Sequence, residues 1–256
     1  MYNHSTTYRQ AILIKHLQIL GERNSGTNYL ASLIQKNIPA IDITNSFGFK
    51  HWFIKDHYPR TLPNNSTDME CTRSLDDSDD TLFLVILRNP FDWLCSMAVN
   101  PYHAPKHVGL PFSTFIRKRW VSYEQTRVNS IWPLSDDGAY FIEEAENIMV
   151  LRSMKIQHWL NLRKRVKNIA FINYEALYKG MSTLENIANE FNILQVNNPF
   201  VNQERYIKGG RLRQELFVPK EQTSIDKQDL EFIQANIDWD VEKYFNYKYQ
   251  NSPMSI

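Results

Sequence analysis

The segment AILIKHLQILGERNSGTNYLASLIQKN, residues 11–37, decides the fold class of this chain. Its first part, residues 11–20, carries apolar side chains in the pattern of a buried β-strand. A tight loop follows over residues 21–26, and residues 27–37 then space their apolar side chains as a helix does, until Pro39 stops it. A strand, a glycine-containing loop and a helix in this order predict the first unit of an α/β domain.

The rest of the chain alternates between strand and helix patterns. TLFLVIL, residues 81–87, is a continuous apolar run typical of a parallel strand covered on both faces, and residues 168–173 predict another strand. This alternation predicts one doubly wound α/β domain over residues 1–256, with a central parallel sheet flanked by helices. Helices are expected over residues 90–97, 112–129, 143–165 and 183–193 and within 226–244, with a polar surface excursion over 56–80 and loop over most of 195–225.

Composition excludes several classes of protein. The chain has 256 residues, of which 43% are hydrophobic and 22% charged, so it is long and apolar enough to bury a sizeable core. Its net charge of +1 lacks the basic excess that holds nucleic acid, so no nucleic-acid partner is expected and any anion needs a local site. The longest strongly apolar run, residues 82–87, is far too short to cross a membrane, and the first twenty residues contain no signal-peptide core. We therefore expect a cytoplasmic protein without a membrane partner.

The cysteines and glycines of the chain limit the kinds of site that it can contain. Cys71 and Cys95 cannot form a disulfide framework and lack metal-ligand spacing, so Cys95 is expected to pack in the core and no metal site is expected. Only 8 glycines occur, and four of them form two clusters. Scarce glycine concentrated in this way indicates backbone that bends sharply or approaches a ligand closely. The clusters are Gly21 with Gly26 and Gly209 with Gly210.

The glycine loop, residues 21–27, is a candidate anion site. It joins a predicted strand to a predicted helix, whose first turn offers free N–H groups and the positive end of the helix dipole. It differs from a Walker A loop because no lysine precedes the Ser/Thr at the start of the helix. Hydrolysis of ATP or GTP is therefore disfavoured, and a phosphate-like group held without magnesium is favoured.

A second anion-binding element follows the buried strand. Arg88 stands at the carboxyl end of residues 81–87, where open α/β sheets bind their ligands. Ser96 lies two helical turns further on and can turn its hydroxyl toward the same anion. Taken alone, this pattern also fits an N-capping turn with a surface arginine.

Together these segments resemble the PAPS-dependent sulfotransferases, where PAPS is 3′-phosphoadenosine 5′-phosphosulfate. Residues 23–29 resemble the 5′-phosphosulfate loop of that family, and residues 88–96 resemble its 3′-phosphate motif. Two weaker motifs follow in the expected order, at residues 173–177, NYEAL, and 208–211, KGGR. The resemblance covers roughly residues 11–212 and implies a P-loop NTPase-like fold, PAPS as co-substrate and PAP as product.

The resemblance implies a role for each motif residue. Tyr29 falls where the family stacks an aromatic ring on adenine, and Tyr174 is a candidate ribose or adenine contact, although either tyrosine also fits a core position. The 5′ end of the nucleotide is expected to contact Arg23, Asn24, Ser25, Gly26, Thr27 and Asn28. The 3′-phosphate is expected to contact Arg88, Ser96, Lys208, Gly209 and Arg211.

Two departures from the family pattern concern cations. Asn24 stands where cytosolic members carry a lysine, and Arg23, one position earlier, is the candidate to replace that charge. Ile207 stands where the family usually has an arginine, and Arg211 or Arg205 is a candidate substitute. The C-terminal dimerisation motif of cytosolic members is not evident, so the oligomeric state stays open.

The resemblance also implies a general base. Lys50 and His51 occupy the place where cytosolic members carry a lysine and then the catalytic histidine. An imidazole with an ordinary pKa near 6.5 is mostly neutral in the cytoplasm and can take a proton from the acceptor. Alternative bases are His103 and His107 and, in the manner of carbohydrate sulfotransferases, Glu22 or Asp56.

These observations predict an enzyme that moves a sulfuryl group from PAPS to a hydroxyl or amine of a small molecule or carbohydrate. Trp52, Phe53 and the region 99–140 are expected to form the acceptor side. A catalytically inert PAPS- or PAP-binding module stays open, with Asn24 and Ile207 as marks of lost activity. A P-loop kinase for a small molecule is the third hypothesis, although the loop lysine and a magnesium carboxylate are missing.

Overall fold

The structure is a computed structural model that describes residues 13–54, 72–123, 142–194, 197, 199–202, 205–208, 211–216 and 225–248. Its strands are β1 (His16–Leu20), β2 (Asp42–Thr44), β3 (Thr81–Leu87), β4 (Trp120–Tyr123), β5 (Ile142–Ala145), β6 (Ile169–Asn173), β7 (Arg205–Lys208) and β8 (Arg211–Leu216). Its α-helices are α1 (Thr27–Asn37), α2 (Pro90–Val99), α3 (Phe112–Arg117), α4 (Ile148–Leu162), α5 (Tyr174–Lys179), α6 (Ser182–Glu190), α7 (Lys227–Asn236) and α8 (Trp239–Glu242). Short 3₁₀ turns are η1 (Leu75–Asp77), η2 (Pro105–His107) and η3 (Lys243–Phe245).

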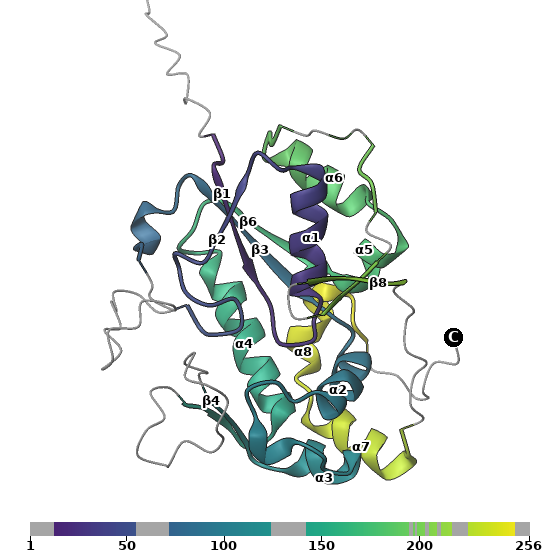
Figure 1. The fold of residues 1–256 in the computed structure, drawn as a ribbon. Helices are drawn as coiled ribbons and strands as arrows, with labels where there is room; N and C mark the ends of the chain where they lie inside the picture. Colours follow the sequence, from purple (N-terminus) through teal and green to yellow (C-terminus); the bar gives the residue numbers. More distant parts are fainter. Residues whose placement is uncertain are drawn as a thin grey trace, which may run out of the picture.

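A four-stranded parallel sheet lies at the centre of the described chain, in the order β2-β1-β3-β6 (Figure 1). The inner strand β3 is buried along its whole length, as its continuous apolar sequence predicts. The predicted α/β fold with a central parallel sheet flanked by helices is therefore confirmed, and the arrangement is consistent with double winding.

Alternate side chains of β3 enter different cores because successive residues of a strand point to opposite faces. Leu82, Leu84 and Ile86 pack with α1, α5 and α6, whereas Phe83, Val85 and Leu87 pack with α4 and the C-terminal α8 and η3. Helices thus cover both faces of the sheet. A third apolar cluster joins α2, α3, the start of α4 and α7.

The strand order fixes where a ligand can approach the sheet. From β1 the chain crosses to β2 on one side and then returns to form β3 on the other side. In open α/β sheets the crevice at such a reversal, at the carboxyl ends of the strands, is the usual ligand site. The loop after β1 and the residue after β3, Arg88, both border that crevice.

Two of the predicted helices prove to be partly strand. The helix predicted over 112–129 ends at Arg117, and β4 begins at Trp120, while residues 124–129 lie outside the described residues. The helix predicted over 143–165 begins only at Ile148, because its first residues form β5, which pairs antiparallel with β4. Asn147 separates strand from helix by accepting hydrogen bonds from the backbone N–H groups of Met149 and Val150. Cross-strand pairing overrides helical periodicity here.

The predicted loop over 195–225 contains the antiparallel hairpin β7–β8. The sequence Gly209-Gly210 between the two strands is a recognised two-residue hairpin signal, and both glycines lie outside the described residues. Helix α5, directly after β6, was not predicted either. β7 contacts α1, and Figure 1 shows the hairpin passing near the amino end of that helix.

Smaller differences between the prediction and the structure concern the bounds of elements and the burial of single residues. β1 begins at His16 rather than residue 11, and Leu13 is exposed, whereas α1 has the predicted bounds. Of the polar excursion 56–80, residues 72–80 are described, and Leu75 and Ser78 are buried, so its end packs against the core. Cys95 is half-buried rather than a core residue, and Cys71 lies outside the described residues. Within the described residues, no helix combines the length and apolarity needed to span a membrane.

Candidate functional site

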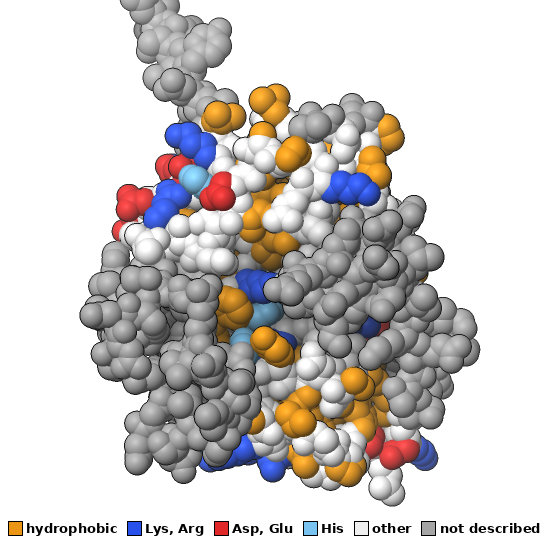
Figure 2. Space-filling view, in the orientation of Figure 1, with side chains coloured by type: hydrophobic (Ala, Val, Ile, Leu, Met, Phe, Trp, Pro, Cys, Tyr) orange, Lys and Arg blue, Asp and Glu red, His pale blue; other side chains and the backbone are white. Residues whose placement is uncertain are grey.

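Residues from four segments of the chain meet at the carboxyl edge of the sheet. They come from the glycine loop after β1, the segment of Lys50 and His51, the start of α2, and α5. In Figure 2, lysine or arginine and histidine side chains gather in a hollow in the middle of the face shown. This edge is where the sequence predicts the anion sites.

Two glycines let the loop fold tightly against the sheet and α5. A Cβ on Gly21 would stand 2.6 Å from the Ile86 carbonyl oxygen. Gly26 has φ +98°, and a Cβ there would stand 2.4 Å from the Tyr174 ring. Gly26 is also the N-cap of α1 and provides no side-chain cap. The first N–H groups of α1, from Thr27 onward, are therefore not capped by that residue and are oriented as donors for an anion.

Arg88 and Ser96 lie together, as the motif predicts. Arg88 Nη1 donates to Ser96 Oγ at 2.9 Å and to the Asn24 carbonyl oxygen at 3.3 Å. Its Cζ lies 5.1 Å from the centre of the Tyr174 ring. Arg88 Nε is buried and has no hydrogen-bond partner among the described residues. The guanidinium thus contacts neutral groups and keeps one buried donor for a further acceptor.

Charged side chains hold the backbone around Arg88 in place. Arg152 donates to the Arg88 carbonyl oxygen at 2.8 Å and forms a buried ion pair with Glu242. Glu175 accepts from the Asn89 N–H at 2.7 Å and from the Tyr247 hydroxyl at 2.8 Å. The C-terminal segment therefore holds the turn that presents Arg88.

Arg23, expected to face the nucleotide, is instead buried. Its side chain is 1% exposed and pairs with Glu22 at 2.7 Å and Glu143 at 3.2 Å. Its Nε donates to His103 Nδ1 at 3.3 Å. Two carboxylates neutralise the guanidinium inside the protein, so it is not the free cation that the sequence led us to expect at this loop.

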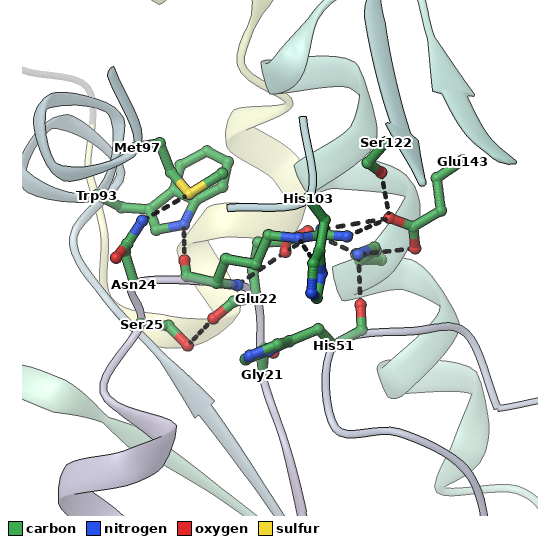
Figure 3. A network of polar contacts seen from close by, with 12 residues as sticks. Gly21, Glu22, Asn24, Ser25, His51, Trp93, Met97, His103, Ser122 and Glu143 are labelled. Atoms are coloured by element: carbon green, nitrogen blue, oxygen red, sulfur yellow. Dashed lines mark hydrogen bonds and ion pairs between the residues drawn. The ribbon is translucent and has the colours of Figure 1, made fainter. Parts of the chain in front are cut away.

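Lys155 completes a buried network that sequence analysis missed (Figure 3). Its Nζ lies 2.7 Å from Glu22, 2.8 Å from Glu143 and 2.6 Å from the His51 carbonyl oxygen. Ser122 of β4 also donates to Glu143. The four charged residues Glu22, Arg23, Glu143 and Lys155, here called the buried charge network, carry two positive and two negative charges.

Charge pairing keeps the Glu22 carboxylate ionised. Although burial alone would raise it, Lys155 and then Arg23 lower the pKa of Glu22 to about 2. An ionised, fully paired carboxylate is a poor proton acceptor at neutral pH. Glu22 is therefore a structural residue here and not the alternative base that the sequence allowed.

Lys50 lies closer to the glycine loop than its sequence position suggests. Its Nζ donates to Asn28 Oδ1 in the first turn of α1. Burial lowers the pKa of Lys50 to about 8. Asn24, where the family has a lysine, has φ +60° and donates to the Asn100 carbonyl oxygen. Lys50 is thus a cation that lies beside this loop, on its Asn28 side.

His51 is buried beneath the loop with its ring held in one orientation. Its Nδ1 lies 2.7 Å from the Gly21 carbonyl oxygen. A carbonyl only accepts, so Nδ1 carries the hydrogen and Nε2 carries the lone pair. Burial, and then the charges of Lys50 and Arg23, lower the pKa of His51 well below its usual value. The imidazole is therefore neutral at neutral pH.

The other predicted residues lie in different parts of the molecule. Ser25 is buried and donates to the Glu22 carbonyl oxygen, and Tyr29 donates to Asn202 while its ring packs edge-on to Tyr174 at 6.0 Å. His107 is buried between Phe115 and Trp120, in the apolar cluster of α2, α3 and α7. Lys208 and Arg211 lie in β7 and β8, whereas Gly209 and Asp56 lie outside the described residues.

Sequence reasoning missed Glu143, Lys155 and Ser122. Glu143 and Lys155 fall in what reads as one polar-faced helix, where a solvated position is the default. Glu143 pairs with Arg23, which is 120 residues away, and no local pattern reports such a contact. Among the described residues, no group of three or more His, Cys, Asp or Glu side chains is arranged to hold a metal ion.

Comparison of the whole sequence with protein-family models and with curated proteins finds no match in either set. What the site can do is therefore inferred from the geometry of its residues.

Proposed function

We propose that the protein is a PAPS-dependent sulfotransferase of P-loop NTPase-like fold. The observation that carries the proposal is the convergence of Arg88, Ser96 and Tyr174 beside the Gly26 end of α1. These residues come from three segments that the sequence resemblance assigns to one nucleotide site. The glycine loop between β1 and α1, at the reversal of strand order, supports the P-loop-like assignment.

The donor set fits a nucleotide with two separated anionic groups. The amino end of α1 and Lys50 suit the 5′-phosphosulfate, because both offer N–H donors on one side of the loop. Arg88 and Ser96 suit the 3′-phosphate, and the buried Nε of Arg88 keeps an unused donor. Burial raises the pKa of Tyr174 to about 12, so its phenol stays neutral beside these anions.

His51 suits the role of general base. When bound, PAPS supplies a sulfuryl group whose S–O bond to the 5′-phosphate breaks as a new bond to the acceptor oxygen or nitrogen forms. His51 Nε2 accepts the proton that the acceptor releases, and Gly21 holds Nδ1–H so that Nε2 keeps its lone pair. Lys50, next to it in the chain, contributes positive charge near the leaving phosphate.

The direct test is binding of PAP, the desulfated product, measured by calorimetry in EDTA. Wild-type protein should bind PAP, and Arg88→Ala should raise the dissociation constant about 10- to 150-fold, because a charge-assisted contact contributes roughly 1.5–3 kcal/mol. Arg163→Ala is the matched control, since Arg163 is exposed after α4 and stacks on Phe171. Equal PAP affinity in folded Arg88→Ala would remove the 3′-phosphate assignment.

Turnover then separates an enzyme from an inert binding module. The wild-type protein is incubated with labelled PAPS and a panel of phenols, amines, alcohols and saccharides, and sulfated products are detected by mass spectrometry. PAP binding without any sulfated product would support the module. Failure to bind PAP would remove both hypotheses and reopen the kinase hypothesis, which the same panel with ATP and magnesium tests.

A further inference from the structure

Two imidazoles lie next to each other in the candidate site, His51 below the glycine loop and His103 in the segment after α2 (Figure 3). Their ring centres are 6.5 Å apart. Phe49 borders both, at 5.1 Å from the ring of His51 and 5.9 Å from that of His103. The two rings therefore share one apolar wall.

The hydrogen-bond partners fix opposite tautomers. The Gly21 carbonyl oxygen accepts from His51, so that ring is protonated at Nδ1. Arg23 Nε donates to His103 Nδ1, and a guanidinium has donors only, so the His103 ring must be protonated at Nε2. His51 thus offers a lone pair at Nε2, whereas His103 offers an N–H at the same ring position.

The buried charge network prevents Arg23 from releasing His103. The other guanidinium nitrogens of Arg23 are held by Glu22 and Glu143, and Lys155 holds those carboxylates in turn. Burial and the charge of Arg23 lower the pKa of His103 to about 3. Its ring is therefore neutral at neutral pH.

His103 is also held in an unusual backbone conformation. Its φ is +68°, in the left-handed region that non-glycine residues rarely adopt. Its ring stacks on Trp52 at 5.4 Å with an interplanar angle of 16°. Strained residues of this kind tend to occur at functional sites, where the surrounding structure enforces them. Among the described residues, no hydrogen bond engages Nε2 of either His51 or His103.

We propose that His103 is a second catalytic residue, whose Nε2–H donates a hydrogen bond to an oxygen of the sulfuryl group during its transfer. The inference rests on the proposed function. The acceptor gives its hydrogen to His51, so the oxygens that still need a donor at the reacting centre are those of the sulfuryl group. His103 keeps its own proton throughout the transfer. His51 alone takes up the proton that the acceptor releases.

Tautomers are measured first, by long-range ¹H–¹⁵N NMR of wild-type protein without nucleotide. His51 should show the Nδ1–H pattern and His103 the Nε2–H pattern. Assignment comes from spectra of His51→Gln and His103→Gln. A His103 ring protonated at Nδ1 would overturn the proposal whatever the protein's activity. Because this measurement needs no PAPS, it is independent of whether the proposed function holds.

Turnover of PAPS is measured next in two variants of His103. His103→Gln places an amide N–H near the position of Nε2 and should keep kcat within about 10-fold, whereas His103→Leu should lose about 10²–10³-fold, as enzymes do when one such donor is removed. The PAP dissociation constant and the thermal midpoint should agree between the two variants. Equal kcat in the two variants would overturn the proposal, whether both stay near the wild-type value or both lose activity. Absence of PAP binding in wild-type protein would instead reject the proposed function.

Discussion

Arg23 and Arg88 follow neighbouring strands at the same edge of the sheet, yet their surroundings differ. Arg23 is 1% exposed and pairs with two carboxylates, whereas Arg88 contacts a hydroxyl, a carbonyl and an aromatic ring. A cation that is already neutralised adds little attraction for an incoming anion. A cation beside neutral groups keeps its field for a ligand. The first arginine is therefore suited to position other groups and the second to bind.

The different surroundings of the two arginines predict different effects of substitution. Burying a charge is costly unless it is paired, so every member of the buried charge network depends on the others. Arg88 and Lys50 depend on no carboxylate among the described residues. Substitutions in the network should therefore change stability, and substitutions at Arg88, Ser96 or His51 should change binding or turnover.

The largest expected effect is on stability. Lys155→Met leaves Glu22 and Glu143 with only Arg23 as counter-charge, so the free energy of unfolding should fall by about 3–5 kcal/mol. Urea denaturation followed by circular dichroism measures it. Lys50→Met is the matched control and should stay within about 1 kcal/mol of wild type. Equal losses in the two variants would contradict the distinction between network and site.

His51→Ala should lower turnover by about 10²–10⁴-fold, because it removes the proposed general base. PAP affinity should change little, since the ring hydrogen-bonds Gly21 rather than the residues around Arg88. Steady-state kinetics together with calorimetry separate the two effects. Near-normal turnover, with a wild-type pH–rate profile, would show that the acceptor needs no base or that another residue supplies it.

Acid should destabilise the protein in two stages. The pKa of His103 is about 3 in the folded state against about 6.5 unfolded, so the unfolded chain binds more protons and stability falls as pH drops below 6.5. His51 and His107 shift the same way, and Glu22, with a pKa of about 2 against 4.5, adds a further loss below pH 4.5. Between pH 6.5 and 4.5, His103→Gln should reduce the slope of unfolding free energy by about one third. An unchanged slope would contradict burial of a neutral His103.

Ser96→Ala should have a smaller effect on the binding side. It removes one neutral partner of Arg88, and a hydrogen bond of this kind contributes about 0.5–1.5 kcal/mol, so PAP affinity should fall about 2- to 12-fold. In the Arg88→Ala background the same change should cost less, because the two residues act on one anion. Full additivity in calorimetry would show that Ser96 acts elsewhere.

Removal of divalent metal should have the smallest effect of all. Glu22, in the glycine loop, and Glu143, which pairs with Arg23, are both engaged by Arg23 and Lys155, so neither of these two carboxylates is free to bind magnesium. Turnover of PAPS should therefore be unchanged in excess EDTA. Activity that disappears with chelator and returns with magnesium would favour phosphoryl transfer.

Local sequence determined the elements whose patterns are complete within a few residues. The bounds of α1 and β3 are those predicted, because helical and strand periodicity repeat every few positions and apolar burial acts on each position directly. The pairing of Arg88 with Ser96 was also predictable, since both lie eight residues apart across one strand end and the helix it enters.

Tertiary structure alone decided which way the charged side chains turn. The Arg23 side chain turns into the protein interior because Glu143 arrives there from β5, 120 residues later in the chain. Other contacts between distant segments act in the same way: pairing with β4 makes β5 a strand, and Lys155 makes Glu22 structural. The Gly21 carbonyl and Arg23 decide that the His51 and His103 rings hold their hydrogens on different nitrogens. Coulombic and hydrogen-bond energies depend on distance in space, and spacing along the chain does not report it.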